Sequence, residues 1–207
     1  EGCGIDPWQT ATLEADDTRA VVGDVILICL YVRDGIAEAV APADRASVSA
    51  VVASLQQRGY RVQLGVTTGE DPTAGQSTLD SVLADSTRRA ALTASISAYA
   101  PLANGITVVP PALAAKSEAS FRAFVSELSA AVPNRKISLF APPQSMTPSD
   151  VPAGDAIKLA ALANQLSHSY LMTLDLHCCD GEPGPTTASD WISTVVSFAR
   201  PQVGTST

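Results

Sequence analysis

Residues capable of chemistry gather after one apolar run in the last quarter of the chain. Asp175 and His177 stand two positions apart, and Cys178, Cys179 and Glu182 follow them. Because side chains two apart on a strand face the same side, Asp175 and His177 suit a shared pocket, in which we expect a catalytic acid/base pair. A Cys–His pair is the variant of this interpretation that uses a neighbouring cysteine. The same residue types bind transition metals, but their spacing fits no structural zinc motif, so we assign no metal. A third interpretation is a polar strand end that makes only structural hydrogen bonds.

Short apolar runs alternate with longer helical patterns along the chain. Period and composition predict strands at residues 8–13, 25–32, 60–66, 105–109, 136–141 and 169–176. Helices are predicted at residues 44–58, 77–100, 117–133, 155–166 and 190–198, with a short turn at 18–22. The chain therefore reads as a β-α alternation repeated six times.

This alternation predicts an α/β fold with parallel strands and outer helices in a single domain over residues 1–207. A doubly wound nucleotide-binding sheet would carry a glycine-rich turn after an early strand, and neither phosphate-binding glycine motif occurs. We therefore favour a TIM-like (β/α) barrel and assign no cofactor.

In such a barrel, ligands bind at the carboxyl ends of the strands. The residues that we expect to contact a ligand there are Thr68, Glu70, Gln144, Glu182, Trp8 and Tyr31. Trp8 and Tyr31 could stack on a sugar ring, although a place in the core or at the barrel rim would suit each of them as well.

Segments of the predicted strands, taken in order, resemble glycoside hydrolase family 18, the chitinase-like barrels. Residues 104–111 stand where that family has D-G-x-D-x-D-x-E on its fourth strand. Residues 120–128 resemble the helix that follows, 136–143 the fifth strand, and 170–175 the M-x-Y-D strand. The resemblance covers roughly residues 60–200. It implies a family in which the strand-4 Glu is the general acid and a neighbouring Asp orients the substrate's N-acetyl group.

The sequence departs from the family pattern where the family places its acids. Asn104 stands at the first Asp, Thr107 at the second, Val109 at the third and Pro111 at the Glu. None of these side chains titrates as an acid, so the resemblance implies that the strand-4 chemistry is lost.

On the sixth strand, Leu174 replaces the family's Tyr and only Asp175 remains. We therefore expect a non-catalytic carbohydrate-binding or scaffold protein, a pseudoenzyme. The alternative is an active hydrolase that uses relocated acids near Asp175, with Glu70 and Glu182 as candidates.

The overall charge excludes several partners. The formal net charge is −8 and the pI is near 4.6, which argues against nucleic acid and against a polybasic membrane anchor. No apolar run reaches the roughly 18 residues that a membrane span needs. The family resemblance implies a glycan or another small molecule as the ligand.

The cysteines indicate the compartment only indirectly. Cys29 lies within an apolar run and reads as a small buried hydrophobic residue, whereas Cys178 and Cys179 could pair with each other only as a strained vicinal disulfide. Cys3 lies close enough to the start to belong to a lipid-anchored export signal, and the chain begins with Glu1, so we expect that a leader has been removed. We expect an extracellular or cell-envelope location.

The length is short for the fold. A closed barrel has eight β-α units and typically about 250 residues, whereas this chain has 207 residues and six recognisable units. We therefore expect an open or reduced barrel, whose sheet edges are closed by the chain's own termini, by self-association or by a partner chain.

Overall fold

The computed structural model describes residues 12–13, 15–33, 35–39, 45–68, 72–110, 113, 115–141, 157–173 and 187–203. The strands are β1 (Asp24–Arg33), β2 (Ile36–Ala39), β3 (Arg61–Thr67), β4 (Gly105–Val108), β5 (Lys136–Ala141) and β6 (His168–Leu171). The helices are α2 (Asp16–Val21), α3 (Arg45–Gln57), α4 (Pro72–Ala84), α5 (Ser86–Tyr99), α6 (Glu118–Ala131), α7 (Leu159–Leu162) and α8 (Ser189–Val203), with the 3-10 turns η1 (Ala100–Leu102) and η2 (Ala115–Ser117).

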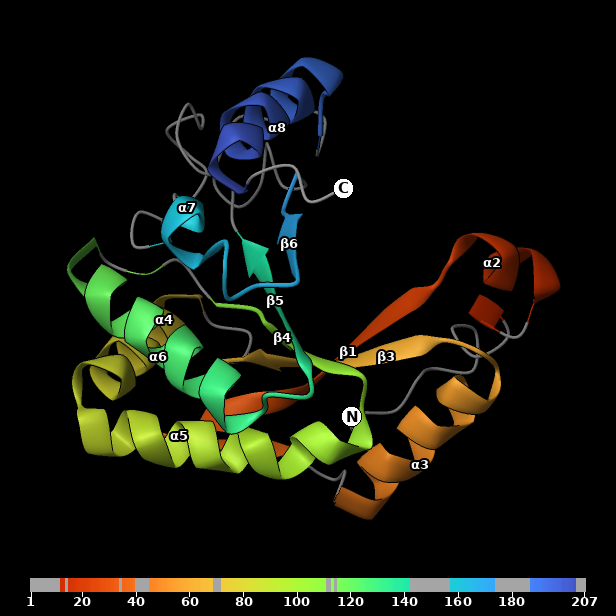
Figure 1. Ribbon diagram of the computed structural model, residues 1–207, viewed down its shortest axis with the longest axis horizontal. Helices are drawn as coiled ribbons and strands as arrows, with labels where there is room; N and C mark the ends of the chain where they lie inside the picture. The colour runs from red at the N-terminus through yellow and green to blue at the C-terminus, as the bar shows by residue number, and fades with distance from the viewer. Residues whose placement is uncertain are drawn as a thin grey trace.

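The strands form one sheet in the order β2-β1-β3-β4-β5-β6 (Figure 1). β1 and β3 to β6 are parallel and follow one another in chain order, without the reversal of order that defines a doubly wound sheet. This sequential order confirms the predicted TIM-like architecture, and the described sheet is not closed. The prediction of six parallel units is wrong in one respect, because β2 is an antiparallel partner of β1 formed after the turn at Gly35.

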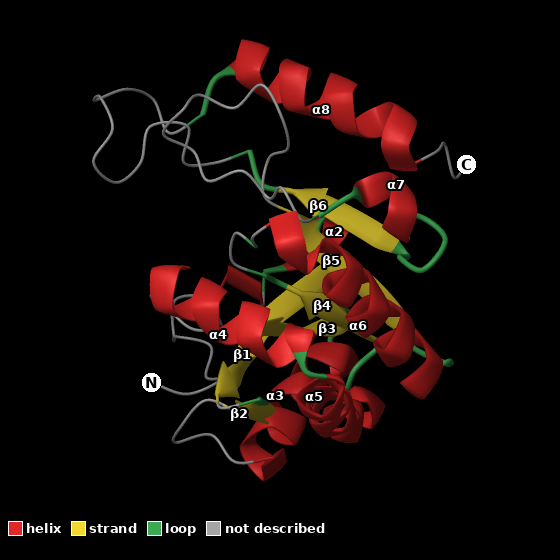
Figure 2. Cartoon of the chain, turned by 90° about the vertical axis from the view of Figure 1, so that its left-hand side faces the viewer, coloured by secondary structure: helices red, strands yellow, loops and turns green. Residues whose placement is uncertain are grey.

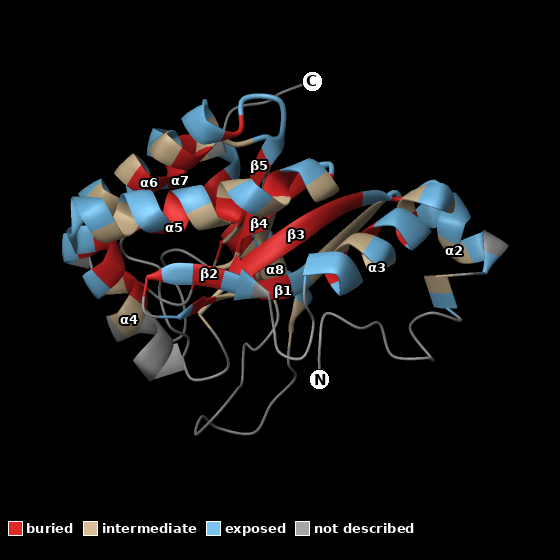
Figure 3. Cartoon of the chain, turned by 90° about the horizontal axis from the view of Figure 1, so that it is seen from below, coloured by how far each residue is buried: buried red, intermediate tan, exposed pale blue. Residues whose placement is uncertain are grey.

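The two faces of the sheet differ in composition. One face carries apolar side chains, among them Val62, Leu64, Ile106 and Leu139, and these belong to a single buried core with α3, α4, α5 and α6 (Figure 3). The residues between them along each strand point to the opposite face, which we call the inner face because it corresponds to the inside of a barrel. The helices therefore fix the sheet from outside and leave the inner face for polar side chains.

A β-bulge in β1 sets which residues reach the inner face. Ile28 is the register partner of Gly65, whereas Leu30 rather than Cys29 is the partner of Val66. The extra residue returns Leu30 to the helix-covered face and places Tyr31 on the inner face. Without this bulge Tyr31 would point toward the helices.

Cys29 itself is fully buried, as expected, but it is disulfide-bonded. The interpretation of Cys29 as only a small hydrophobic residue is therefore wrong. Its partner is one of the other three cysteines, which all lie outside the described residues: Cys3, Cys178 and Cys179.

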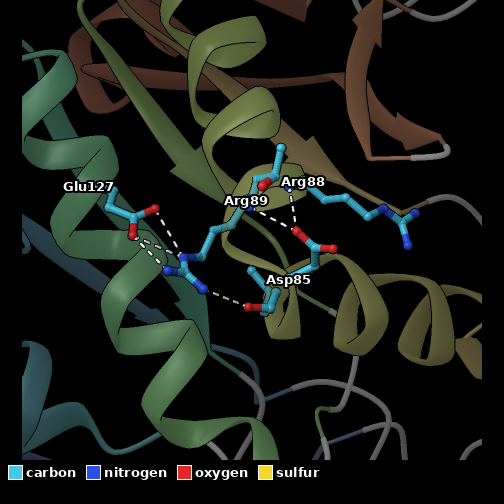
Figure 4. A network of polar contacts seen from close by, with 6 residues as sticks. Asp85, Arg88, Arg89 and Glu127 are labelled. Atoms are coloured by element: carbon cyan, nitrogen blue, oxygen red, sulfur yellow. Dashed lines mark hydrogen bonds and ion pairs between the residues drawn. The ribbon is translucent and has the colours of Figure 1, made fainter.

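The long helix predicted at residues 77–100 is two helices, α4 and α5. The Asp85 carboxylate accepts hydrogen bonds from the backbone N–H groups of Thr87 and Arg88, at 2.8 and 3.1 Å, and so caps α5. These two bonds hold the pKa of Asp85 below its ordinary value. The break lets α5 turn so that Arg89 meets Glu127 of α6, with Nη2 2.9 Å from Oε1 (Figure 4).

Other elements differ from the prediction mainly in length. Thr12 and Leu13, placed in a first strand by the sequence, are helical. α7 is one turn, shorter than the helix predicted at residues 155–166, and α8 packs on α7 and β6 at one end of the molecule (Figure 2). No helix in the described part of the chain is long and apolar enough to cross a membrane.

Candidate functional site

The inner face is built from one sequence pattern repeated in three neighbouring strands. Gln63, Thr107 and Ser138 each stand between two buried apolar residues of β3, β4 and β5. The strand registers bring Gly65, Thr107 and Ser138 side by side, and Gln63 lies one inner-face position before Gly65. All three polar side chains are buried, so the inner face carries an internal polar layer rather than an apolar barrel core.

Hydrogen bonds connect this layer across the sheet. The Thr107 hydroxyl donates to Oε1 of Gln63 at 2.9 Å, and Nε2 of Gln63 donates to the Tyr170 hydroxyl of β6 at 3.0 Å. We call these three residues the transverse hydrogen-bond chain. It satisfies both ends of the buried amide, which would otherwise cost about 1–3 kcal/mol for each unpaired group. Ser138, the register neighbour of Thr107, has no hydrogen-bond partner for its hydroxyl among the described residues.

Two glycines allow neighbouring strands to approach closely on the inner face. A Cβ on Gly105 would lie 2.7 Å from the carbonyl oxygen of Lys136 and 3.4 Å from Oε1 of Gln63. A Cβ on Gly65 would lie 2.9 Å from Cγ1 of Ile28, beside the β1 bulge. The glycine at position 105 thus allows β4 to lie close to the Lys136 backbone of β5.

Charged groups occupy the amino end of the inner face. Nε and Nη2 of Arg61 lie 2.9 and 2.6 Å from the two carboxylate oxygens of Asp24, its register partner. The hydrogen bond from Arg61 is the main reason that the pKa of Asp24 lies below its ordinary value, with smaller contributions from the charges of His168 and Lys136. The pKa of Arg61 is raised by the same pair. This end lies opposite the strand ends where barrel sites form.

The carboxyl ends of the central strands are apolar where they are described. A cavity of about 10 Å³, enough for about one water molecule, lies between the strand ends and the helices. Its lining residues are Val32, Val66, Thr67, Thr68, Leu79, Leu92, Val108, Val109, Pro110 and Phe124. Such a space holds no sugar ring. The wall at the end of β4 is formed by valine and proline side chains, and no acid of the described residues lines it.

The structure describes two of the predicted ligand-binding residues. Tyr31 is half-buried on the inner face and is the register partner of Thr67. Thr68 directly follows β3 and lines the small cavity on the helix side. The other candidates, Asp175, His177, Glu70, Gln144, Glu182 and Trp8, lie outside the described residues, so their predicted convergence stays a prediction. Within the described ranges, no group of three His, Cys, Asp or Glu residues could hold a metal ion.

From the sequence alone, Thr107 is notable for the acid that it replaces, whereas Gln63, Ser138 and Tyr170 are not predicted site residues. A usable signal was present in the triplets Val-Gln-Leu, Ile-Thr-Val and Ile-Ser-Leu of residues 62–64, 106–108 and 137–139. One polar residue between two apolar ones, repeated in successive parallel strands, indicates a polar layer on the face away from the helices.

Comparison with solved structures agrees with this architecture. A chitinase from Chromobacterium violaceum matches with a TM-score of 0.80 over 97% of this chain, at 19% identity. The spore cortex-lytic enzyme SleL from Bacillus cereus matches with a TM-score of 0.77 over 96% of this chain, at 16% identity. A chitinase-like agglutinin from Robinia pseudoacacia matches with a TM-score of 0.71 over 94% of this chain, at 14% identity.

These likenesses define the class of fold. The chain has a chitinase-like α/β architecture similar to that of glycoside hydrolase family 18, as the sequence resemblance predicted. It spans 63% of the length of the Chromobacterium chitinase and of the agglutinin, and 45% of SleL. No family model and no curated protein matches the sequence.

Proposed function

We propose that this protein is a chitinase-like barrel protein that binds a glycan without hydrolysing it. The observation that carries the proposal is the end of β4. Thr107 is fully buried and bonded to Gln63, and the sequence has Val109 and Pro111 at the next two positions where the resemblance places carboxylates. A general acid must lie within hydrogen-bond reach of the glycosidic oxygen, and these side chains supply no proton.

The structural neighbours support both parts of the proposal without separating them. The fold occurs both in chitinases and in a chitinase-like agglutinin. The missing acids at the end of β4 favour the second kind. Tyr31, half-buried on the inner face, is the described residue best suited to stack on a sugar ring.

The test measures binding and turnover on the same preparation. We expect chitotetraose to bind in isothermal titration calorimetry and to raise the thermal midpoint, while fluorogenic chitobiose substrates stay intact. Cellotetraose, which lacks the acetamido groups, is the matched control ligand. No heat, no midpoint shift and no retention on chitin would contradict the glycan proposal.

The same assay decides the alternative of an active hydrolase. Turnover of the chitobiose substrate that disappears in Asp175→Ala would establish relocated acids near Asp175. Turnover that survives Asp175→Ala, Glu70→Ala and Glu182→Ala would point to chemistry that none of the proposed acids performs.

The disulfide at Cys29 supports the proposal of an extracellular or cell-envelope location, because disulfides persist in oxidising compartments. The two ends of the described sheet, β2 and β6, support the proposal that self-association or a partner chain covers a sheet edge. Sedimentation velocity tests the second point, and a monomer over the full concentration range would exclude self-association.

A further inference from the structure

We propose that the hydrogen bond from Gln63 to the Tyr170 hydroxyl holds the edge strand β6 against the curved inner face. Gln63 and Tyr170 are then positioning residues for β6, at the edge of the described sheet. The proposal concerns the sheet and does not require a ligand, whereas its consequence for binding rests on the proposed function.

The position of β6 makes such a contact necessary. In the described sheet, β6 pairs only with β5, over the residues from His168 to Leu171. An edge strand of this length is held by few ladder hydrogen bonds and is prone to local opening. The transverse hydrogen-bond chain attaches β6 to strands that are not its neighbours.

The distance that the bond spans shows what it constrains. Three strand intervals separate β3 from β6, which in a flat sheet amounts to about 14 Å. Side chains that stand away from a flat sheet would not meet over that distance, yet Nε2 of Gln63 lies 3.0 Å from the Tyr170 hydroxyl oxygen. The bond can therefore form only when β4 to β6 curve inward. Because it forms only in the curved sheet, it stabilises that curvature.

The local environment favours a specific and persistent bond. Gln63 is buried, and its amide oxygen is already held by Thr107, so the amide plane is fixed and Nε2 is directed at β6. The Tyr170 ring stacks on His168, with ring centroids 6.0 Å apart. Loss of the Tyr170 hydroxyl would leave the buried Nε2–H group of Gln63 without its acceptor. This group could gain another partner only if β6 moved.

Hydrogen exchange of the intact protein tests the proposal without a ligand. In Tyr170→Phe we expect the backbone amides of residues 168–171 to exchange about fivefold faster, the factor that corresponds to one net hydrogen bond, while β3 exchanges at the wild-type rate. The matched control is Tyr60→Phe, which removes a hydroxyl that donates to the Leu13 carbonyl at 2.7 Å on the other side of the sheet. That control should leave β6 unchanged.

A second variant keeps the test decisive. Gln63→Met has a similar length but no amide, and we expect it to accelerate exchange in β6 as Tyr170→Phe does. The double variant should be no faster than either single variant, because both remove the same bond. Unchanged exchange in β6, or equal acceleration of β3 and β6 in Tyr170→Phe, would overturn the proposal.

Chitotetraose affinity gives the functional arm. If wild-type protein binds this probe, Tyr170→Phe should weaken binding several-fold while Tyr60→Phe leaves it unchanged, and equal affinities would overturn the positioning role. If wild-type protein does not bind chitotetraose, the glycan proposal fails, and exchange in β6 still decides whether the bond holds the edge strand.

Discussion

Gln63 and Tyr170 are 107 residues apart in the chain, yet the Gln63 amide nitrogen lies 3.0 Å from the Tyr170 hydroxyl oxygen. The contact crosses the inner face above β4 and β5, and Thr107 completes it from β4. In the family that the sequence resembles, the position of Thr107 belongs to a carboxylate. In this protein the same position holds a neutral amide in place, so the residue has a structural role where a titrating group is expected.

Thr107 is the first position at which this conclusion can be tested. Thr107→Val should lower the free energy of unfolding by about 1 kcal/mol, because the buried Oε1 of Gln63 loses its donor. Urea unfolding with a linear extrapolation measures the change. An unchanged free energy of unfolding would mean that Gln63 finds another donor.

Thr107→Asp should have a larger effect that depends on pH. Burial opposite the Gln63 oxygen would raise the folded-state pKa of the introduced carboxyl above its unfolded value. The variant should therefore be most stable at acid pH and lose stability as the pH rises through the unfolded pKa of about 4. Urea midpoints measured from pH 3 to pH 7 give the slope, and Thr107→Asn is the uncharged control. A flat difference between the two variants would contradict this expectation.

Any side chain at position 105 should lower the free energy of unfolding. In Gly105→Ala the new Cβ would lie 2.7 Å from the Lys136 carbonyl oxygen, so β4 or β5 must shift, at an expected cost of about 1–3 kcal/mol. Gly23→Ala is the matched control, because its Cβ would meet only the end of the Arg61 side chain at 3.5 Å. Thermal unfolding of both variants measures the difference, and equal midpoints would show that the strands yield easily.

The contact between α5 and α6 should depend on Arg89 and not on its neighbour. Arg89 bonds both carboxylate oxygens of Glu127 and the Leu83 carbonyl, with distances of 2.8 to 3.0 Å (Figure 4). Arg89→Ala should cost about 1–2 kcal/mol. Arg88→Ala, which removes one long bond of 3.4 Å to Ser81, should change stability little. Chemical denaturation separates the two, and equal losses would contradict this assignment.

Acid should weaken the amino end of the inner face. The pKa of Asp24 lies below its ordinary value of 3.8, chiefly because of the hydrogen bond from Arg61, so the pair contributes stability above that pH. This contribution is lost as the pH falls through the lowered folded-state pKa. Asp24→Asn should therefore flatten the decline of the urea midpoint between about pH 4 and pH 2, whereas Asp17→Asn, exposed on α2, should not. A slope unchanged by Asp24→Asn would show that other carboxylates govern acid unfolding.

The disulfide of Cys29 should contribute to stability under oxidising conditions. Reduction should lower the free energy of unfolding by about 2–4 kcal/mol, the usual range for a native disulfide. Thermal unfolding with and without a thiol reductant measures the effect, and non-reducing peptide mass spectrometry identifies the partner cysteine. A free Cys29 thiol in the oxidised protein would contradict the bond and remove the support for an oxidising compartment.

The strands were the most predictable part of the fold. β3, β4 and β5 were predicted within a residue or so of their ends, because parallel strands covered by helices are continuous apolar runs. β2 was missed, because four residues after a turn carry too short a pattern to be distinguished from a loop. The break between α4 and α5 was missed because an N-cap at Asp85 interrupts an apolar stripe that continues on both sides.

The sequence by itself determined the fold class, the absence of acids from positions 107, 109 and 111, and the candidates Asp175 and His177. Only the tertiary structure decided that Tyr31 reaches the inner face, because a one-residue bulge reverses the direction of every later side chain in β1. Only the tertiary structure joined Gln63 to Tyr170, because a side-chain hydrogen bond over three strands depends on sheet curvature. Local periodicity gives the face on which a residue lies, and it does not give the distance between strands that are not neighbours.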